Sequence, residues 1–149
     1  MKRRIVLFMT VLMAFSLCAC GIGTKKEAAE ASVLLSNTAW AGIVGEVFGD
    51  NTYHILVFTN GGNGSGDVEY AIQIGDTTTF DVRGKYTISA DGIIKTSYEE
   101  QIKDGTWGAI DEGRVDQDRF QYVMSDGKIT ELYRVNDNGE LTDRFYQLE

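Results

Sequence analysis

The feature that most constrains this chain is a sustained alternation of apolar and other side chains after about residue 37. The alternation is clearest over residues 68–74, 80–88, 119–124 and 129–135. Successive side chains of a β-strand point to opposite faces of the sheet, so a period of two predicts strands that bury one face. One buried and one solvated face is typical of antiparallel sheets. The alternation therefore predicts an all-β domain.

Turn residues stand between the alternating stretches. Asp91-Gly92, Asp126-Gly127 and Asn138-Gly139 each separate two such stretches, which is the strongest short-range signal for a β-hairpin. The glycine-rich stretch 61–66 predicts a longer flexible loop between two strands. The chain has no proline, so no strand is barred from the interior of a sheet. We expect eight to ten strands, at about residues 40–48, 53–59, 67–74, 78–82, 84–89, 93–99, 106–110, 119–125, 128–135 and 140–148.

Consecutive hairpins that share one apolar face must close on themselves or fold into two layers. Closure leaves no exposed strand edge, which favours a barrel. A barrel of about eight strands has an interior just large enough for side chains or one small ligand. We therefore predict an antiparallel up-and-down meander that closes into a barrel, with a two-layer β-sandwich as the alternative.

The N-terminus has the layout of a secretory signal peptide. A basic segment, Met1–Arg4, precedes an apolar stretch over residues 5–17 that is short for a membrane-spanning helix. The following segment, Leu17–Gly21, resembles the lipobox of bacterial lipoproteins. This resemblance implies cleavage before Cys20 and a diacylglyceryl group on its sulfur. Buried acyl CH₂ groups contribute about 0.8 kcal/mol each, so two or three chains anchor a protein firmly. An uncleaved signal-anchor helix is the alternative.

These features divide the chain into three parts. Residues 1–19 form the signal peptide, residues 20–36 the lipidated N-terminus and a spacer, and residues 37–149 the barrel domain. The spacer contains helix-forming residues, and we expect it to hold the domain off the membrane with few neighbours of its own. The predicted location is the cell membrane, with the domain outside the cytoplasm and attached to lipid through Cys20.

Charge and cysteine content exclude several kinds of partner. Loss of Lys2, Arg3 and Arg4 with the signal takes the 14 basic residues to 11, against 22 acidic ones, a side-chain balance of −11. Such a surface excludes nucleic acid and disfavours anionic lipid headgroups, but it suits a basic protein partner. Cys18 leaves with the signal and Cys20 is lipidated, so no disulfide or cysteine metal site is expected.

Several segments together resemble small bacterial lipocalin-like lipoproteins. They are Trp40-Ala41-Gly42 at the first strand, the hairpin Gly84-Lys85-Tyr86 to Asp91-Gly92, and the upstream lipobox. The resemblance covers about residues 37–149 and implies a ligand-binding barrel. In such a barrel we expect Trp40 to plug the closed end. Tyr70, Tyr86, Tyr122 and Tyr133 are candidate ligand-lining residues, because they combine aromatic surface with a hydroxyl, and core packing or cross-strand pairing is the alternative role for them.

No pattern of catalytic or metal-binding residues emerges. His54 is the only histidine, whereas a zinc site needs three or four ligands. Ser65 does not stand in a nucleophile elbow. Acidic neighbours such as Glu99 and Glu100 point to opposite faces of a strand, although Asp116 and Asp118 would share one. We therefore expect no catalytic residue, no metal and no cofactor, and we predict that the protein is not an enzyme.

Three functions stay open at this point. The first is an anchored barrel that binds a small apolar or amphipathic ligand. The second is an acidic interaction or inhibitor module with a filled core and a basic protein partner. The third, which the sequence favours least, is a hydrolase that uses two facing carboxylates across a cleft.

Overall fold

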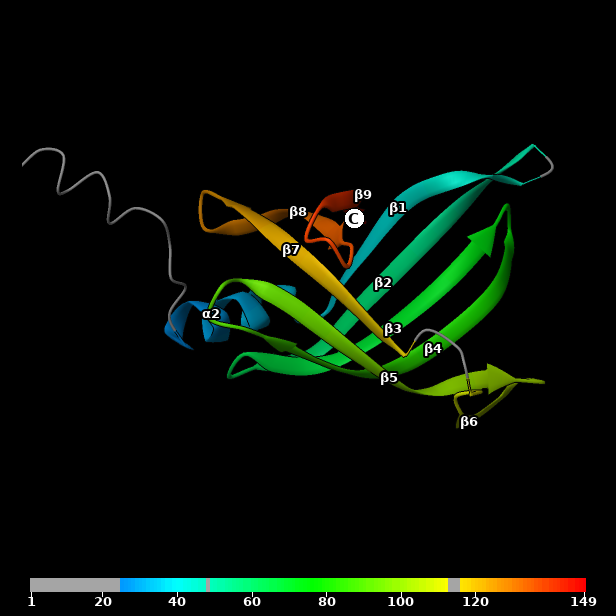
Figure 1. The fold of residues 1–149 in the computed structure, drawn as a ribbon, viewed down its shortest axis with the longest axis horizontal. Helices are drawn as coiled ribbons and strands as arrows, with labels where there is room; N and C mark the ends of the chain where they lie inside the picture. Colours follow the sequence, from blue (N-terminus) through cyan, green and yellow to red (C-terminus); the bar gives the residue numbers. More distant parts are fainter. Residues whose placement is uncertain (1–24, 48, 113–115) are drawn as a thin grey trace, which may run out of the picture.

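The computed structural model describes residues 25–47, 49–112 and 116–149. The predicted signal peptide and Cys20 lie outside these residues. Within these ranges, one helix is followed by nine strands (Figure 1). They are α2 (Lys25–Leu35), β1 (Thr38–Val47), β2 (Asp50–Gly62), β3 (Ser65–Ile74), β4 (Thr77–Ile88), β5 (Ile93–Lys103), β6 (Thr106–Ala109), β7 (Gln117–Ser125), β8 (Lys128–Val135) and β9 (Leu141–Gln147).

Eight of these strands form a closed antiparallel barrel. Strands β1 to β5 pair in chain order, β5 then pairs with β7, β7 pairs with β8, and β8 pairs with β9. The ring closes where β9 pairs with β1, at Trp40–Gln147 and Ala41–Tyr146. Strand β6 lies outside the ring and pairs with the end of β5. The predicted all-β meander and its closure are confirmed, the sandwich alternative is wrong, and the barrel is consistent with a lipocalin-like fold.

Alternation places one face of each strand inside the barrel. The largest fully buried side chains include Trp40, Phe58, Tyr86, Phe120 and Phe145. Phe120 and Phe145 meet edge to face, with ring centroids 5.6 Å apart. Buried aromatic side chains of this size dominate the hydrophobic stabilisation of a small domain. Much of the interior is therefore filled by the chain's own side chains.

Helix α2 packs across one end of the barrel, which we call the capped end. Its buried positions Ala28, Ala31, Ser32 and Leu35 follow the spacing of one helical face. The Gly64 N–H donates to Ser32 Oγ at 2.9 Å. The segment predicted to have few neighbours is thus part of the folded unit, because small residues let the helix approach the strands closely. Within the described residues, no helix has the length and apolarity needed to cross a bilayer.

The predicted flexible loop over residues 61–66 is wrong. Strands β2 and β3 continue to a two-residue turn, Asn63-Gly64, with φ angles of 54° and 82°. The neighbouring glycines serve close packing: a Cβ on Gly61 would lie 1.9 Å from the Ser32 carbonyl oxygen, and one on Gly66 would lie 2.6 Å from the Tyr86 ring. Glycine is thus needed here for space, whereas the sequence pattern suggested flexibility.

Strand β4 is continuous, although the pattern predicts two strands at about 78–82 and 84–89. Its pairing with β5 shifts register between Arg83 and Gly84, and this irregularity interrupts the alternation. A Cβ on Gly84 would lie 1.9 Å from the Ser97 carbonyl oxygen. The strand continues through this irregularity and stays in the ring.

The barrel has two distinct ends. The capped end holds α2 and the turns at Asn63-Gly64, Asp91-Gly92 and Asp126-Gly127. The opposite end, which we call the distal end, holds the β3–β4 turn and the Asn136–Glu140 connection between β8 and β9. In Figure 1 the hairpins β1–β2, β3–β4 and β5–β6 all extend toward the distal end.

Candidate functional site

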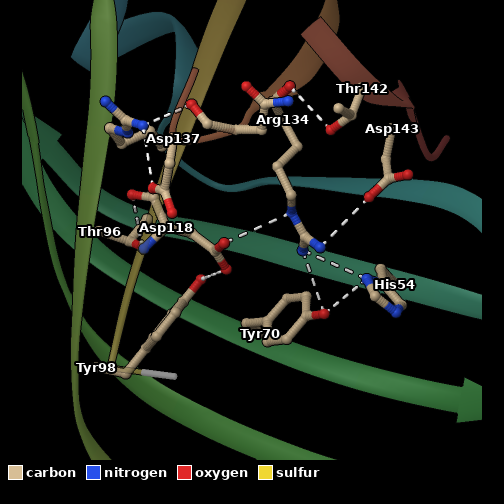
Figure 2. Close-up of polar contacts among 11 residues, drawn as sticks. His54, Tyr70, Thr96, Tyr98, Asp118, Arg134, Asp137, Thr142 and Asp143 are labelled. Carbon is tan, nitrogen blue, oxygen red and sulfur yellow. Dashed lines mark hydrogen bonds and ion pairs between the residues drawn. The ribbon is translucent and has the colours of Figure 1, made fainter. Parts of the chain in front are cut away.

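A network of polar side chains occupies the distal half of the barrel interior. We call it the distal polar cluster; its members come from six strands and converge on one guanidinium group (Figure 2). They are His54 (β2), Tyr70 (β3), Tyr98 (β5), Asp118 (β7), Arg134 (β8) and Asp143 (β9). All but Tyr98 stand two positions from a buried apolar residue of their own strand, and Tyr98 stands two positions from the buried Thr96, so alternation turns each of them inward.

Arg134 is the centre of the cluster, with a side chain that is 20% exposed. Its Nη1 lies 3.4 Å from Asp143 Oδ2, and its Nη2 donates to the Tyr70 hydroxyl at 3.2 Å. Its Nε lies 3.5 Å from Asp118 Oδ1, within ion-pair distance but without hydrogen-bond geometry. The guanidinium charge is therefore held between two carboxylates.

The two tyrosine hydroxyl groups of the cluster each form a hydrogen bond with another member. The Tyr70 hydroxyl and His54 Nδ1 are 2.6 Å apart, and Arg134 Nη2 lies 3.3 Å from the same nitrogen. The Tyr98 hydroxyl donates to Asp118 Oδ2 at 3.4 Å. Thr96 Oγ1 accepts from the Asp118 N–H at 2.9 Å, which fixes the start of β7 against β5.

Three aromatic rings lie against the guanidinium group of Arg134. Its carbon lies 5.6 Å from the centroid of Tyr70, 5.7 Å from that of Phe120 and 5.9 Å from that of Phe145. Tyr70 stacks on Tyr98 with centroids 5.8 Å apart. Cation–π attraction of this kind is stronger in a desolvated site. The cluster thus joins charged groups to an aromatic surface.

Burial sets the protonation of the cluster. It raises the pKa of Asp118, although the Arg134 charge opposes this shift. It lowers the pKa of His54, helped by the charge of Arg134, so the imidazole is neutral at pH 7. Burial also raises the pKa values of Tyr70 and Tyr98, which keeps both phenols protonated. The cluster thus combines one guanidinium group with two carboxyl groups.

The cluster is reached through a groove of about 610 Å³, which we call the distal groove. The β7–β8 pairing ends at Phe120–Arg134, and beyond that pair the two strands diverge. Arg119 spans the gap, its Nη2 donating to the Asn136 carbonyl oxygen at 2.6 Å. The groove is lined by Lys95, Thr96, Gln117, Asp118, Arg119, Arg134, Val135, Asn136 and Asp137.

A second groove, of about 420 Å³, lies on the outer face of strands β2 to β5. Its charged lining residues, which define what we call the outer groove, are Asp67, Glu69, Arg83, Lys85, Glu99 and Glu100. Arg83 Nε donates to Glu100 Oε2 at 2.7 Å, and its guanidinium carbon lies 4.3 Å from the centroid of Trp107 on β6. This surface is predominantly acidic and has an aromatic ring at its edge.

The four tyrosines assigned from the sequence do not line one cavity. Tyr70 belongs to the distal polar cluster. Tyr86 is buried at the capped end and donates to the Ser32 carbonyl oxygen at 3.3 Å. Tyr122 is half-buried against the hydrophobic core. The Tyr133 hydroxyl donates to Glu131 Oε2 at 2.8 Å, with Arg144 over its ring.

Trp40 is buried near the start of β1. Its Nε1 donates to Thr38 Oγ1 at 2.8 Å, and the Thr38 hydroxyl donates to the Leu35 carbonyl oxygen of α2. This position ties the indole to the capped end, and its role as a plug stays a prediction. Cys20 lies outside the described residues, so its lipidation also stays a prediction.

Sequence reasoning missed Arg134, Asp118 and Asp143 as a site. The available signal was positional: each stands two residues before or after a core residue, namely Leu132, Phe120 and Phe145. A charged side chain on the apolar side of an alternating strand therefore marks the interior cluster. In the described ranges no group of three or more His, Cys, Asp or Glu side chains is placed to hold a metal ion.

Comparison with known protein families, characterised proteins and solved structures finds no match to this chain. The site is therefore interpreted from its own geometry.

Proposed function

We propose that this protein is a lipid-anchored, lipocalin-like lipoprotein of the cell membrane that faces outside the cytoplasm and binds a small amphipathic ligand in the distal groove. The observation that carries the proposal is Arg134. Its charge lies inside the barrel, above stacked tyrosines, where the wall opens into the groove.

An ionic cluster inside a barrel needs an explanation other than stability. Burying paired charges costs about as much free energy as their attraction returns, and apolar side chains of similar volume often stabilise a core better. The capped half of this barrel is filled in that way. Perturbed pKa values beside a groove are typical of binding and catalytic sites. The distal polar cluster therefore supports a role in recognition.

The geometry favours a ligand with one polar and one apolar part. The polar part would meet Arg134 and Asp118, and the apolar part would lie against Val135 and the aliphatic portions of the other lining side chains. Because the cluster holds two carboxylates and one guanidinium, a neutral or cationic polar group suits it better than an anionic one. A filled capped half limits binding to the distal half, which suits a ligand of modest length.

The anchor and the absence of catalysis rest on separate observations. The basic segment, the apolar stretch and the lipobox support export and lipidation of Cys20. The Arg134 charge opposes the rise that burial causes in the pKa of Asp118, and Asp143 pairs with the same guanidinium, so neither carboxyl group is free for general acid catalysis. A binding role without chemistry follows as the simplest use of the site.

Native mass spectrometry of the full chain, purified gently from its own host, tests the proposal. We expect an extra mass that is lost on denaturation, and we expect Asp118→Asn and Arg134→Met to lose it. Arg144→Met is the matched control, because Arg144 lies outside the barrel and should keep the bound mass. A clean apo mass for the unmutated chain, repeated with added lipids, would contradict ligand carriage.

The outer groove favours a second candidate, an interaction module for a basic protein. Four acidic residues line it and Trp107 flanks it, which suits a cationic partner with an exposed apolar residue. Such binding should weaken steeply with salt and should be lost in Trp107→Ala but kept in Asp118→Asn. Binding that ignores salt or survives both substitutions equally would exclude this candidate.

A further inference from the structure

The capped end exposes several large apolar side chains although α2 covers the core there. Val33 and Leu34 lie on the face of α2 that points away from the barrel and are 60% and 37% exposed. Val123, Met124 and Leu148 are 40%, 45% and 47% exposed. Exposed apolar residues gathered in one region of a small protein mark a contact surface more often than chance.

The positions of these residues in the fold bring them to the same end. Val123 and Met124 lie near the end of β7, one residue before the β7–β8 turn at the capped end (Figure 1). The Leu148 N–H donates to the Ala39 carbonyl oxygen at 2.8 Å, beside the start of β1 and just after α2. We call these five residues the apolar rim: Val33, Leu34, Val123, Met124 and Leu148.

The chain itself limits how far this end can lie from lipid. Helix α2 begins at Lys25, five residues after Cys20. Five residues span at most about 18 Å when fully extended. If Cys20 carries acyl chains that lie in the bilayer, the start of α2 stays within that distance of the membrane. The distal groove lies at the other end of the barrel.

We propose that the apolar rim rests in the interfacial region of the membrane to which Cys20 is attached, and that the distal groove faces away from the bilayer. This inference rests on the proposed lipid anchor. The occupant of the rim is the surface of that same membrane, through apolar contact with lipid. The acidic surface of the domain disfavours attraction to anionic headgroups, so the contact operates on neutral lipid. Helix α2 is then a contact element, whereas the sequence suggested a spacer.

Site-specific quenching tests the orientation. Once the signal is removed and Cys20 is acylated, the chain has no other thiol, so single cysteines can be labelled with a fluorophore. Val33→Cys and Met124→Cys report on the rim. Leu141→Cys is the matched control, an apolar residue at the distal end that is 49% exposed. The lipidated full-length variants are reconstituted into phosphatidylcholine vesicles that contain a nitroxide-labelled lipid.

We expect loss of fluorescence at positions 33 and 124, and little loss at position 141. Leu34→Asp added to Met124→Cys should reduce the quenching at position 124, because it places a charge in the rim. Equal quenching at all three positions, or none at any, in a chain shown by mass to carry lipid on Cys20 would overturn the orientation alone. A chain without lipid on Cys20 would overturn both the anchor and this inference.

Discussion

At the scale of single residues, the stability of the distal half of the barrel depends strongly on Arg134. Its guanidinium is the shared partner of Asp118 and Asp143 and also contacts Tyr70 and His54. Removing the guanidinium would leave its buried partners without their hydrogen bonds and ion pairs. Its replacement should therefore affect stability as well as binding.

Arg134→Met should lower the free energy of unfolding by about 3 kcal/mol at pH 7, because two partly buried carboxylates lose their cation. Adding Asp118→Asn and Asp143→Asn should restore most of the loss, since no unpaired charge then remains. Urea denaturation followed by circular dichroism measures both effects. Arg144→Met is the surface control and should change the free energy by less than about 1 kcal/mol. A triple variant as unstable as the single one would contradict this account.

Asp81 offers a test of pH dependence. Burial raises the pKa of Asp81 to about 6 from its ordinary 3.8, with further help from the charge of Glu69, and its Oδ1 lies buried without a hydrogen-bond partner. The folded state therefore binds the proton more tightly than the unfolded state. The stability from the protonated form is fully present below pH 3.8 and is lost as pH rises through about 6.

Asp81→Asn, which stays neutral, should therefore gain stability relative to the unmutated protein between pH 4 and pH 7. Urea denaturation at these two values, with Asp76→Asn as an exposed control from the preceding turn, measures the difference. An Asp81→Asn variant whose relative stability is the same at both values would show that burial of this carboxyl has no energetic effect.

Gly84 tests the close approach of β4 and β5. Gly84→Ala would place a Cβ within 1.9 Å of the Ser97 carbonyl oxygen, so the two strands must move apart. We expect a loss of about 2–4 kcal/mol in the free energy of unfolding. Gly108→Ala, in β6 with open space around its Cα, is the matched control and should have little effect. Equal denaturation midpoints for the two variants would refute the packing role of Gly84.

At the scale of elements, the sequence predicts most strands and few of their special features. Alternation locates the strands, and Asp126-Gly127 places the β7–β8 turn correctly because both positions need positive φ. The glycines at 61 and 66 mislead, since the same residue type serves both flexible loops and tight packing. The sequence does not predict that Arg134 forms ion pairs with Asp118 and Asp143. These contacts depend on how the strands that carry the three residues are arranged in the closed barrel.

Helix α2 contributes to stability through its small buried face. Ala31 is fully buried against the barrel, whereas Val33 on the same helix is 60% exposed. Ala31→Glu should undock the helix and speed backbone amide exchange over residues 25–36 and in the neighbouring β2–β3 turn. Val33→Glu leaves the docked face intact and should keep the protection. Hydrogen exchange by mass spectrometry distinguishes the two, and similar exchange in both would argue against docking.

At the scale of the whole molecule, the barrel has one weak seam. Strands β1 and β9 pair at only two register positions, while β3 and β4 pair along almost their full length. We expect amide exchange to be fastest for the strand hydrogen bonds of β9 and its partners in β1, because few backbone bonds must break to open the ring there. Uniform protection around the ring would show that the interior, including Phe145, holds the seam closed.

The position of β6 outside the ring has a consequence for self-association. Among the described strands, each of the other eight has a partner strand on both sides over part of its length, whereas β6 pairs only with β5 and has no partner on its other side. Such edges invite strand addition from a second molecule and lead toward aggregation. Here the edge is four residues long and the preceding turn carries Lys103 and Asp104. This brevity limits strand addition, so lengthening β6 should promote assembly of many copies edge to edge.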